Sequence, residues 1–94
     1  MEKIFKDKYK KIFCIVREEL NKIDPIGVVK YNSNLVDEYD MENQMIIPLI
    51  NDYSDYKEFA KKICEILTNA TGEQLQPENC YECAKNILDK SKIL

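Results

Sequence analysis

The chain of 94 residues contains no histidine. Without an imidazole side chain, Ser-His and Cys-His nucleophile pairs, histidine-containing zinc sites and acid–base catalysis by histidine are all excluded. Glycine is also scarce, because Gly27 and Gly72 are the only two and stand alone. A glycine-rich loop that wraps phosphate groups is therefore absent as well. These absences remove most of the common enzyme classes.

Long hydrophobic runs are missing too. No apolar stretch approaches the roughly 20 residues that cross a membrane, and the first residues carry no export signal. We therefore expect a cytoplasmic protein without a membrane partner, in which the four cysteines are reduced and form no disulfide framework. Hydrophobic residues make up 45% of the chain and charged residues 33%, which is typical of a folded protein. Residues 1–94 should form a single helical domain.

Three prolines and two glycines leave few places where a long element must end. Residues 3–22 carry apolar side chains at steps of three and four, which predicts a long amphipathic helix. Asp24-Pro25 should end this helix because proline restricts the residue before it, and Gly27 permits the turn that follows. Residues 28–31 could form a short extended piece before a turn.

A second helix is predicted to start near Asp37, with acidic residues at the positive end of its dipole. Its inward positions would include Tyr39 and Met45. Pro48 interrupts this pattern, so it should either kink the helix or end it early.

Two more helices follow. Ser54 is a suitable N-cap for the third, which would turn Ala70 inward and be closed by Gly72. Pro77 fits the first position of the fourth. The predicted fold is therefore all-α, a small antiparallel bundle of three to four helices with an irregular acidic connector after the first helix. Such a small core is marginally stable, so formation of a homodimer would help it.

Charge is uneven along the chain. Residues 1–22 hold seven Lys/Arg and four Asp/Glu, a balance of +3, whereas residues 23–58 hold two and eight, a balance of −6. Residues 59–94 hold five of each, so the total is −3. The acidic middle argues against a nucleic-acid partner, because phosphate binding needs a concentrated basic face.

The connector, residues 24–42, concentrates five carboxylates where the helical periodicity breaks. Asp37, Glu38, Asp40 and Glu42 could hold Mg²⁺ or Ca²⁺, but the alternating oxygen ligands and central glycine of an EF-hand loop are missing. A catalytic carboxylate pair would need a pocket. Acidic residues in the first turn of a helix are also favoured by capping and by the dipole alone. The remaining interpretation is a surface that binds a partner.

Tyrosine mixed with charge is typical of protein interfaces, and the connector contains Tyr31 and Tyr39. The alternative is that Tyr39 fills the bundle with its hydroxyl at the rim. The residues that we expect to bind a partner are Asp24, Tyr31, Asp37, Glu38, Tyr39, Asp40 and Glu42.

Cys80 and Cys83 form a C-x-x-C pair near a predicted helix start. A helix N-terminus lowers thiol pKa, and this spacing suits a redox dithiol or half of a metal site. A complete all-cysteine zinc site needs a second close pair, whereas Cys14 and Cys64 are isolated. Packing of the thiols at a chance spacing is the other interpretation. A metal- or redox-active thiol protein is thus the alternative function.

The connector also resembles the YugE-like family of small bacterial proteins of unknown function. The matching motifs are Asp24-Pro25-Ile26-Gly27, Asp37-Glu38-Tyr39-Asp40 with Glu42, and then Ile46 and Leu49-Ile50. They cover about residues 20–50, and the resemblance in length extends over the whole chain. The resemblance implies a compact all-α fold and brings no established activity, cofactor or catalytic residue. Related motifs occur in small proteins that resemble toxin-immunity partners. Pro48 and the Cys80/Cys83 pair depart from the family pattern.

We therefore expect a non-enzymatic module without a cofactor, whose connector binds another protein. A basic partner, such as a toxin domain, would be selected by electrostatic complementarity. This hypothesis requires the acidic side chains of the connector to face outward instead of being used in folding.

Overall fold

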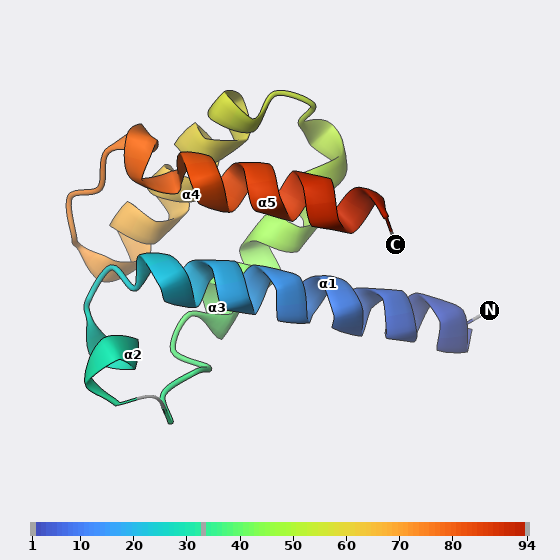
Figure 1. The fold of residues 1–94 in the computed structure, drawn as a ribbon, viewed down its shortest axis with the longest axis horizontal. Helices are drawn as coiled ribbons and strands as arrows, with labels where there is room; N and C mark the ends of the chain where they lie inside the picture. The colour runs from blue at the N-terminus through green and yellow to red at the C-terminus, as the bar shows by residue number, and fades with distance from the viewer. Residues whose placement is uncertain (1, 33, 94) are drawn as a thin grey trace.

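The computed structural model describes residues 2–32 and 34–93, with side chains from residue 7 onward. The elements are α1 (Glu2–Ile23), α2 (Val28–Tyr31), α3 (Asp40–Ile46), η1 (Ile47–Asp52), α4 (Tyr56–Thr71), η2 (Pro77–Cys80) and α5 (Tyr81–Lys92), where η denotes a 3-10 helix. The described residues contain no strand, so the predicted all-α class is confirmed (Figure 1). No described helix is both long enough and apolar enough to cross a membrane.

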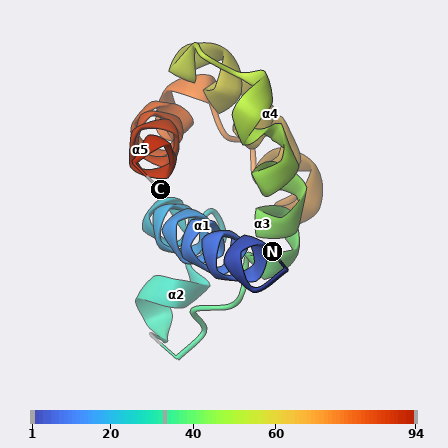
Figure 2. The same ribbon diagram turned by 90° about the vertical axis from the view of Figure 1, so that its right-hand side faces the viewer.

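The longest helix, α1, packs against α5, and α5 in turn packs against α4. Figure 1 shows that α1 leads away from the side where both chain ends lie, and that α5 returns to it. In the perpendicular view, α1, α3, α4 and α5 surround the core, whereas α2 lies outside this ring, next to α1 (Figure 2). The part of the connector around α2 is therefore attached to the outside of the helical body.

The core is filled mainly from α1, α3, α4 and α5, with Ile50 added from η1 and Cys80 from η2. Its fully buried side chains include Val16, Leu20, Ile46, Phe59, Ile63, Leu67 and Ile87. Within α1 and α4 these positions recur every four residues, as an amphipathic helix requires. The predicted inward positions of Met45 and Ala70 are wrong, because both are exposed, Met45 by 56%. They line an open groove between α3 and α4 instead.

The first helix ends at Ile23, as Asp24-Pro25 predicted. Asp24 has a left-handed backbone with φ 45°, and Gly27 has φ 71°. Left-handed geometry is costly for most residues, but Asp tolerates it because its short side chain can bond locally. Residues 28–31 form the short helix α2, so the extended piece predicted there is wrong.

The second predicted helix starts later than expected. Turns occupy residue 34 and residues 36–39, and α3 begins at Asp40 instead of near Asp37. It ends at Ile46, two residues before Pro48, and the chain continues as η1. Early termination was one of the two outcomes that this proline predicted.

The N-cap of α4 is Asp55, not Ser54, because the Asp55 carboxylate accepts a hydrogen bond from the Lys57 backbone N–H at 2.9 Å. Gly72 closes α4 with φ 76°, as predicted. Pro77 opens the 3-10 helix η2, so α5 itself begins four residues later than expected.

Candidate functional site

Asp24 and Tyr39 form a buried polar contact that closes the base of the connector. The Tyr39 hydroxyl donates a hydrogen bond to Asp24 Oδ1 at 2.6 Å and accepts one from the Ile26 backbone N–H at 3.2 Å. The Asp24 carboxylate also accepts hydrogen bonds from the backbone N–H groups of Val29, at 3.2 Å, and Lys30, at 2.9 Å. Asp24 thereby accepts hydrogen bonds from N–H groups in the first turn of α2, which have no partner within the helix. Through Tyr39 it also joins the two ends of the connector.

Asp24 and Tyr39 therefore both have a structural role in the folded protein. Asp24 is only 5% exposed and Tyr39 only 2%. Burial disfavours the charged form of Asp24, but hydrogen bonds from Tyr39 and the two backbone N–H groups outweigh it and hold the pKa of Asp24 below its ordinary value. Burial, together with the neighbouring Asp24 carboxylate, raises the pKa of Tyr39. The prediction that Asp24 and Tyr39 bind a partner is wrong, because neither presents its polar atoms to solvent.

Two further contacts tie the connector to α1. Arg17 Nε donates to Asp40 Oδ1 at 3.0 Å while its Nη2 group bonds Oδ2, a bidentate pair. Asn21 Nδ2 donates to the Val36 carbonyl at 2.9 Å. Arg17 already balances the charge of Asp40, so this carboxylate has less charge to offer a partner. Glu42 is half-buried on α3.

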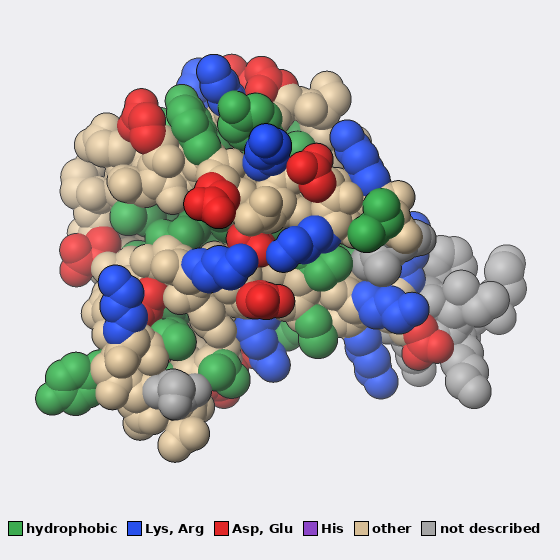
Figure 3. Space-filling model, in the orientation of Figure 1, with side chains coloured by type: hydrophobic (Ala, Val, Ile, Leu, Met, Phe, Trp, Pro, Cys, Tyr) green, Lys and Arg blue, Asp and Glu red, His purple; other side chains and the backbone are tan. Residues whose placement is uncertain are grey.

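The outer part of the connector stays accessible. Tyr31 is 95% exposed, and Asp37 and Glu38 are exposed as well. Large hydrophobic side chains are exposed in the same region, and we define the outer connector as Tyr31, Leu35, Val36, Asp37, Glu38 and Met41. In Figure 3 the region around α2, at lower left, projects from the body and carries hydrophobic side chains on its surface. Leu35, Val36 and Met41 were not predicted as part of this surface. Their position outside the helical periodicity was the only feature of the sequence that indicated their exposure.

Glu19 is a second buried carboxylate, and sequence analysis gave it no role. It is 1% exposed between α1 and α5, where Lys90 Nζ donates to it at 3.0 Å, Asn86 Nδ2 at 3.2 Å and Lys22 Nζ at 3.1 Å. Burial opposes its ionisation, but these hydrogen bonds prevail and lower the pKa of Glu19. No local pattern predicts this contact, because Asn86 and Lys90 lie 67 and 71 positions away along the chain.

The C-x-x-C pair lies in the interior. Cys64, Cys80 and Cys83 are buried, whereas Cys14 is exposed. Burial, with a smaller effect from neighbouring Cys64, raises the pKa of Cys80 to about 12, and burial also raises the pKa of Cys83. The predicted lowering of thiol pKa is therefore wrong, because loss of solvation exceeds the effect of the helix N-terminus. Among the described residues, no group of three His, Cys, Asp or Glu side chains is placed to hold a metal ion.

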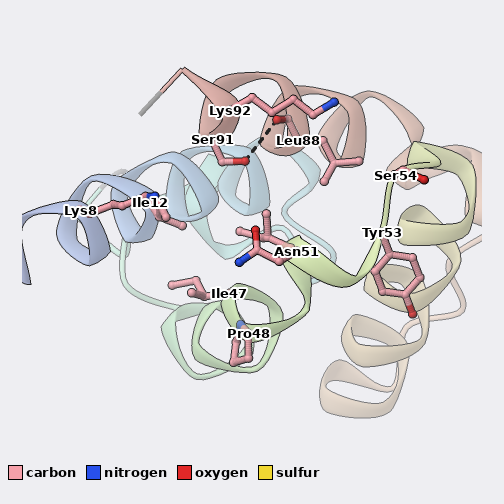
Figure 4. Close-up of a pocket in the computed structure, with 11 residues that line it drawn as sticks. Lys8, Ile12, Ile47, Pro48, Asn51, Tyr53, Ser54, Leu88, Ser91 and Lys92 are labelled. Atoms are coloured by element: carbon pink, nitrogen blue, oxygen red, sulfur yellow. Dashed lines mark hydrogen bonds between the residues drawn. The ribbon is translucent and has the colours of Figure 1, made fainter. Parts of the chain in front are cut away.

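A cavity of about 470 Å³ lies between α1, η1 and α5. Ile12, Ile47 and Leu88 line it from these three elements (Figure 4). Lys8 and Lys92 lie at two of its edges, from α1 and α5. Sequence analysis did not predict this cavity, because residues from both ends of the chain form it.

No protein-family model matches the chain, and searches of curated proteins and of solved structures also return no match. The YugE-like resemblance therefore stays a prediction.

Proposed function

We propose that this protein is a non-enzymatic module that binds a protein partner through the outer connector. The observation that carries the proposal is the exposure of Tyr31 beside several aliphatic side chains and two acidic ones. Asp37 and Glu38 form no ion pair with any described residue, so their charges are available to a partner.

Apolar side chains in a cluster on the surface favour association, because a complex removes them from water. Six of the eight large hydrophobic residues exposed in the described part of the chain lie between residues 26 and 45. Tyrosine contributes a large contact area with little loss of side-chain freedom, and is enriched among residues that dominate binding energies. The concentration of both features in one short segment supports an interface there.

The anchored base of the connector supports the proposal further. The Asp24–Tyr39 hydrogen bond and the Arg17–Asp40 pair hold the connector against α1 from both ends. A segment that is already held in place loses less conformational freedom on binding than an unrestrained one.

The partner that this surface favours is basic, because Asp37 and Glu38 would speed association with a positive surface and disfavour an acidic one. A toxin domain with a basic face is one such partner, in line with the related motifs in small proteins that resemble toxin-immunity partners. We propose a cytoplasmic setting, and a small antiparallel bundle of three to four helices as the architecture. The opposite directions of α1 and α5 support that architecture.

Affinity capture with matched charge variants tests the proposal. Asp37→Lys with Glu38→Lys reverses two charges in the outer connector, and Asp52→Lys with Glu73→Lys reverses two exposed charges elsewhere. A partner should be retained by the wild type and by the second variant, and lost from the first. Equal recovery by all three proteins, with unchanged circular dichroism, would contradict the proposal.

Truncation of Tyr31 tests the aromatic contribution separately from charge. Tyr31→Ala should weaken binding of the captured partner by about ten-fold, the size typical of a central interface tyrosine. Tyr31→Phe keeps the ring and should retain most of the affinity. If the two variants bound equally, the ring would have no part in recognition.

The alternative based on Cys80 and Cys83 gains no support from two buried thiols with raised pKa values. A thiol reagent added to the native protein should modify Cys14 rapidly and the other three only after unfolding. Rapid reaction of Cys80 or Cys83, or stoichiometric metal in elemental analysis, would favour the alternative.

A further inference from the structure

The cavity between α1, η1 and α5 suggests a second site, separate from the outer connector. We propose that it binds an amphiphilic anion, an alkyl chain that carries a carboxylate head. This proposal does not depend on the proposed function, because the two surfaces share no residue.

The volume and floor of the cavity suit an alkyl chain. Its volume of about 470 Å³ is within the range of small-molecule sites in proteins. Ile12 from α1, Ile47 and Ile50 from η1, and Leu88 from α5 supply apolar surface from three elements. An alkyl chain that covers these side chains would release the water in contact with them.

The edges of the cavity suit an anionic head. Lys8 and Lys92 are the charged residues among the described lining residues, and no acidic residue lines the cavity. Neither lysine forms an ion pair with a described residue. A helix dipole favours Lys92 at the end of α5, but it gives no such reason for Lys8 in the first half of α1. Two lysines from different helices therefore lie at the edges of one apolar floor.

Hydrogen-bonding groups complete the site. Figure 4 shows Asn51 between α1 and η1, in the middle of the cavity, where its amide could bond a carboxylate oxygen. The Ser91 hydroxyl is already used, because it donates to the Leu88 carbonyl at 3.2 Å. Lys8, Lys92 and Asn51 are therefore the groups that would bind the head of the ligand.

Titration of the ¹⁵N-labelled protein with three eight-carbon amphiphiles below their micelle concentrations tests the site. The probes are octanoate, octanol and octyltrimethylammonium, which share an alkyl chain and differ in charge. Octanoate should bind most tightly and octyltrimethylammonium least, with shifts confined to residues around the cavity. Shifts that centre elsewhere, or no saturable shift with octanoate, would overturn the proposal.

Matched lysine variants separate specific from general electrostatic attraction. Lys8→Gln with Lys92→Gln should weaken octanoate binding by roughly two- to five-fold per lysine, with little change for octanol. Lys11→Gln with Lys85→Gln removes two exposed lysines from the same helices, outside the cavity, and should leave octanoate affinity unchanged. An equal loss in both double variants would show that net charge alone attracts octanoate, and would overturn the assigned head-group site.

A filled cavity provides the third comparison. Asn51 is exposed, so Asn51→Trp should fill the cavity without disturbing the core. It should abolish binding of octanoate and octanol while the circular dichroism spectrum stays unchanged. If a folded Asn51→Trp protein bound octanoate as the wild type does, the ligand would lie elsewhere. The Asp37→Lys, Glu38→Lys variant should bind octanoate normally, which keeps this test distinct from that of the outer connector.

Discussion

The two ends of the connector and its outer part contain the same residue types in opposite roles. Asp24 and Tyr39 are buried and bonded to each other, whereas Asp37 and Tyr31 are exposed. Composition is therefore a poor guide to the role of a carboxylate or a phenol in this segment. The role depends on which hydrogen-bond donors the folded chain brings to each side chain.

The donors around Asp24 explain the difference. Three of them, two backbone N–H groups and the Tyr39 hydroxyl, face its carboxylate. The Asp24 backbone is left-handed as well, a geometry that a short hydrogen-bonding side chain favours. Asp37 contributes a backbone carbonyl to a turn with Asp40, at 3.1 Å, while its side chain stays exposed.

Removal of the Asp24 carboxylate should have the largest effect. Asp24→Ala leaves three donors without their acceptor and places Ala in a left-handed backbone, so the free energy of unfolding should fall by about 3 kcal/mol. Urea denaturation measures this change. Asp37→Ala is the matched control and should change it by no more than about 0.5 kcal/mol. A similar loss in both variants would remove the distinction between the two carboxylates.

Acidification should weaken the hydrogen bonds to the Asp24 carboxylate. The loss of stability should be smaller than in Asp24→Ala, because a protonated carboxyl still accepts hydrogen bonds. Asp24 and Glu19 have pKa values lowered by folding, so their ionisation adds stability above the unfolded-state pKa, about 4. That stability is lost as pH falls through their lower folded pKa values. Urea midpoints between pH 7 and pH 2 should decrease in the acid range, and Asp24→Asn with Glu19→Gln should reduce the decrease. A double variant with the wild-type pH dependence would contradict this assignment.

Removal of one hydroxyl tests the other member of the buried pair. Tyr39→Phe loses a hydrogen bond to an ionised acceptor and one from the Ile26 N–H, so it should cost about 1–2 kcal/mol of unfolding free energy. Tyr31→Phe should have no measurable effect, since Tyr31 is 95% exposed. If the two substitutions cost the same, Tyr39 would not hold the connector.

Neutralisation of the outer carboxylates should have the smallest effect on stability. Asp37→Asn with Glu38→Gln should change the free energy of unfolding by less than about 0.5 kcal/mol, because neither side chain is tied to another described residue. Thermal and urea unfolding both measure it. A large loss would place these residues among the structural carboxylates and leave the proposed interface without its acidic members.

Sequence reasoning succeeded where local rules govern. The apolar spacing of residues 3–22 predicted the long amphipathic helix α1, whose Val16 and Leu20 are buried in the core. Asp24-Pro25 predicted the end of α1, and Gly72 the end of α4. It failed for Met45, because α3 turns Asn43 and Ile46 into the core and leaves Met45 on its exposed side.

The candidate site was harder to predict than the helices. Asp24 was identified as a residue of interest, but its hydrogen bond to Tyr39 spans 15 positions and no local pattern specifies it. The burial of Glu19 gave no signal, because only Lys22 is a local partner and the other two, Asn86 and Lys90, belong to the other end of the chain. Local periodicity identifies helices, whereas the burial of a carboxylate depends on which helices meet.

Carbodiimide labelling of carboxylates, followed by mass spectrometry, tests most directly whether the connector has a buried base and an exposed outer part. In the native protein, Asp37 and Glu38 should be labelled more than about ten-fold faster than Asp24, because Asp24 reacts only when the base of the connector opens. In urea the three rates should become similar. Native labelling of Asp24 as fast as that of Asp37 would contradict the account.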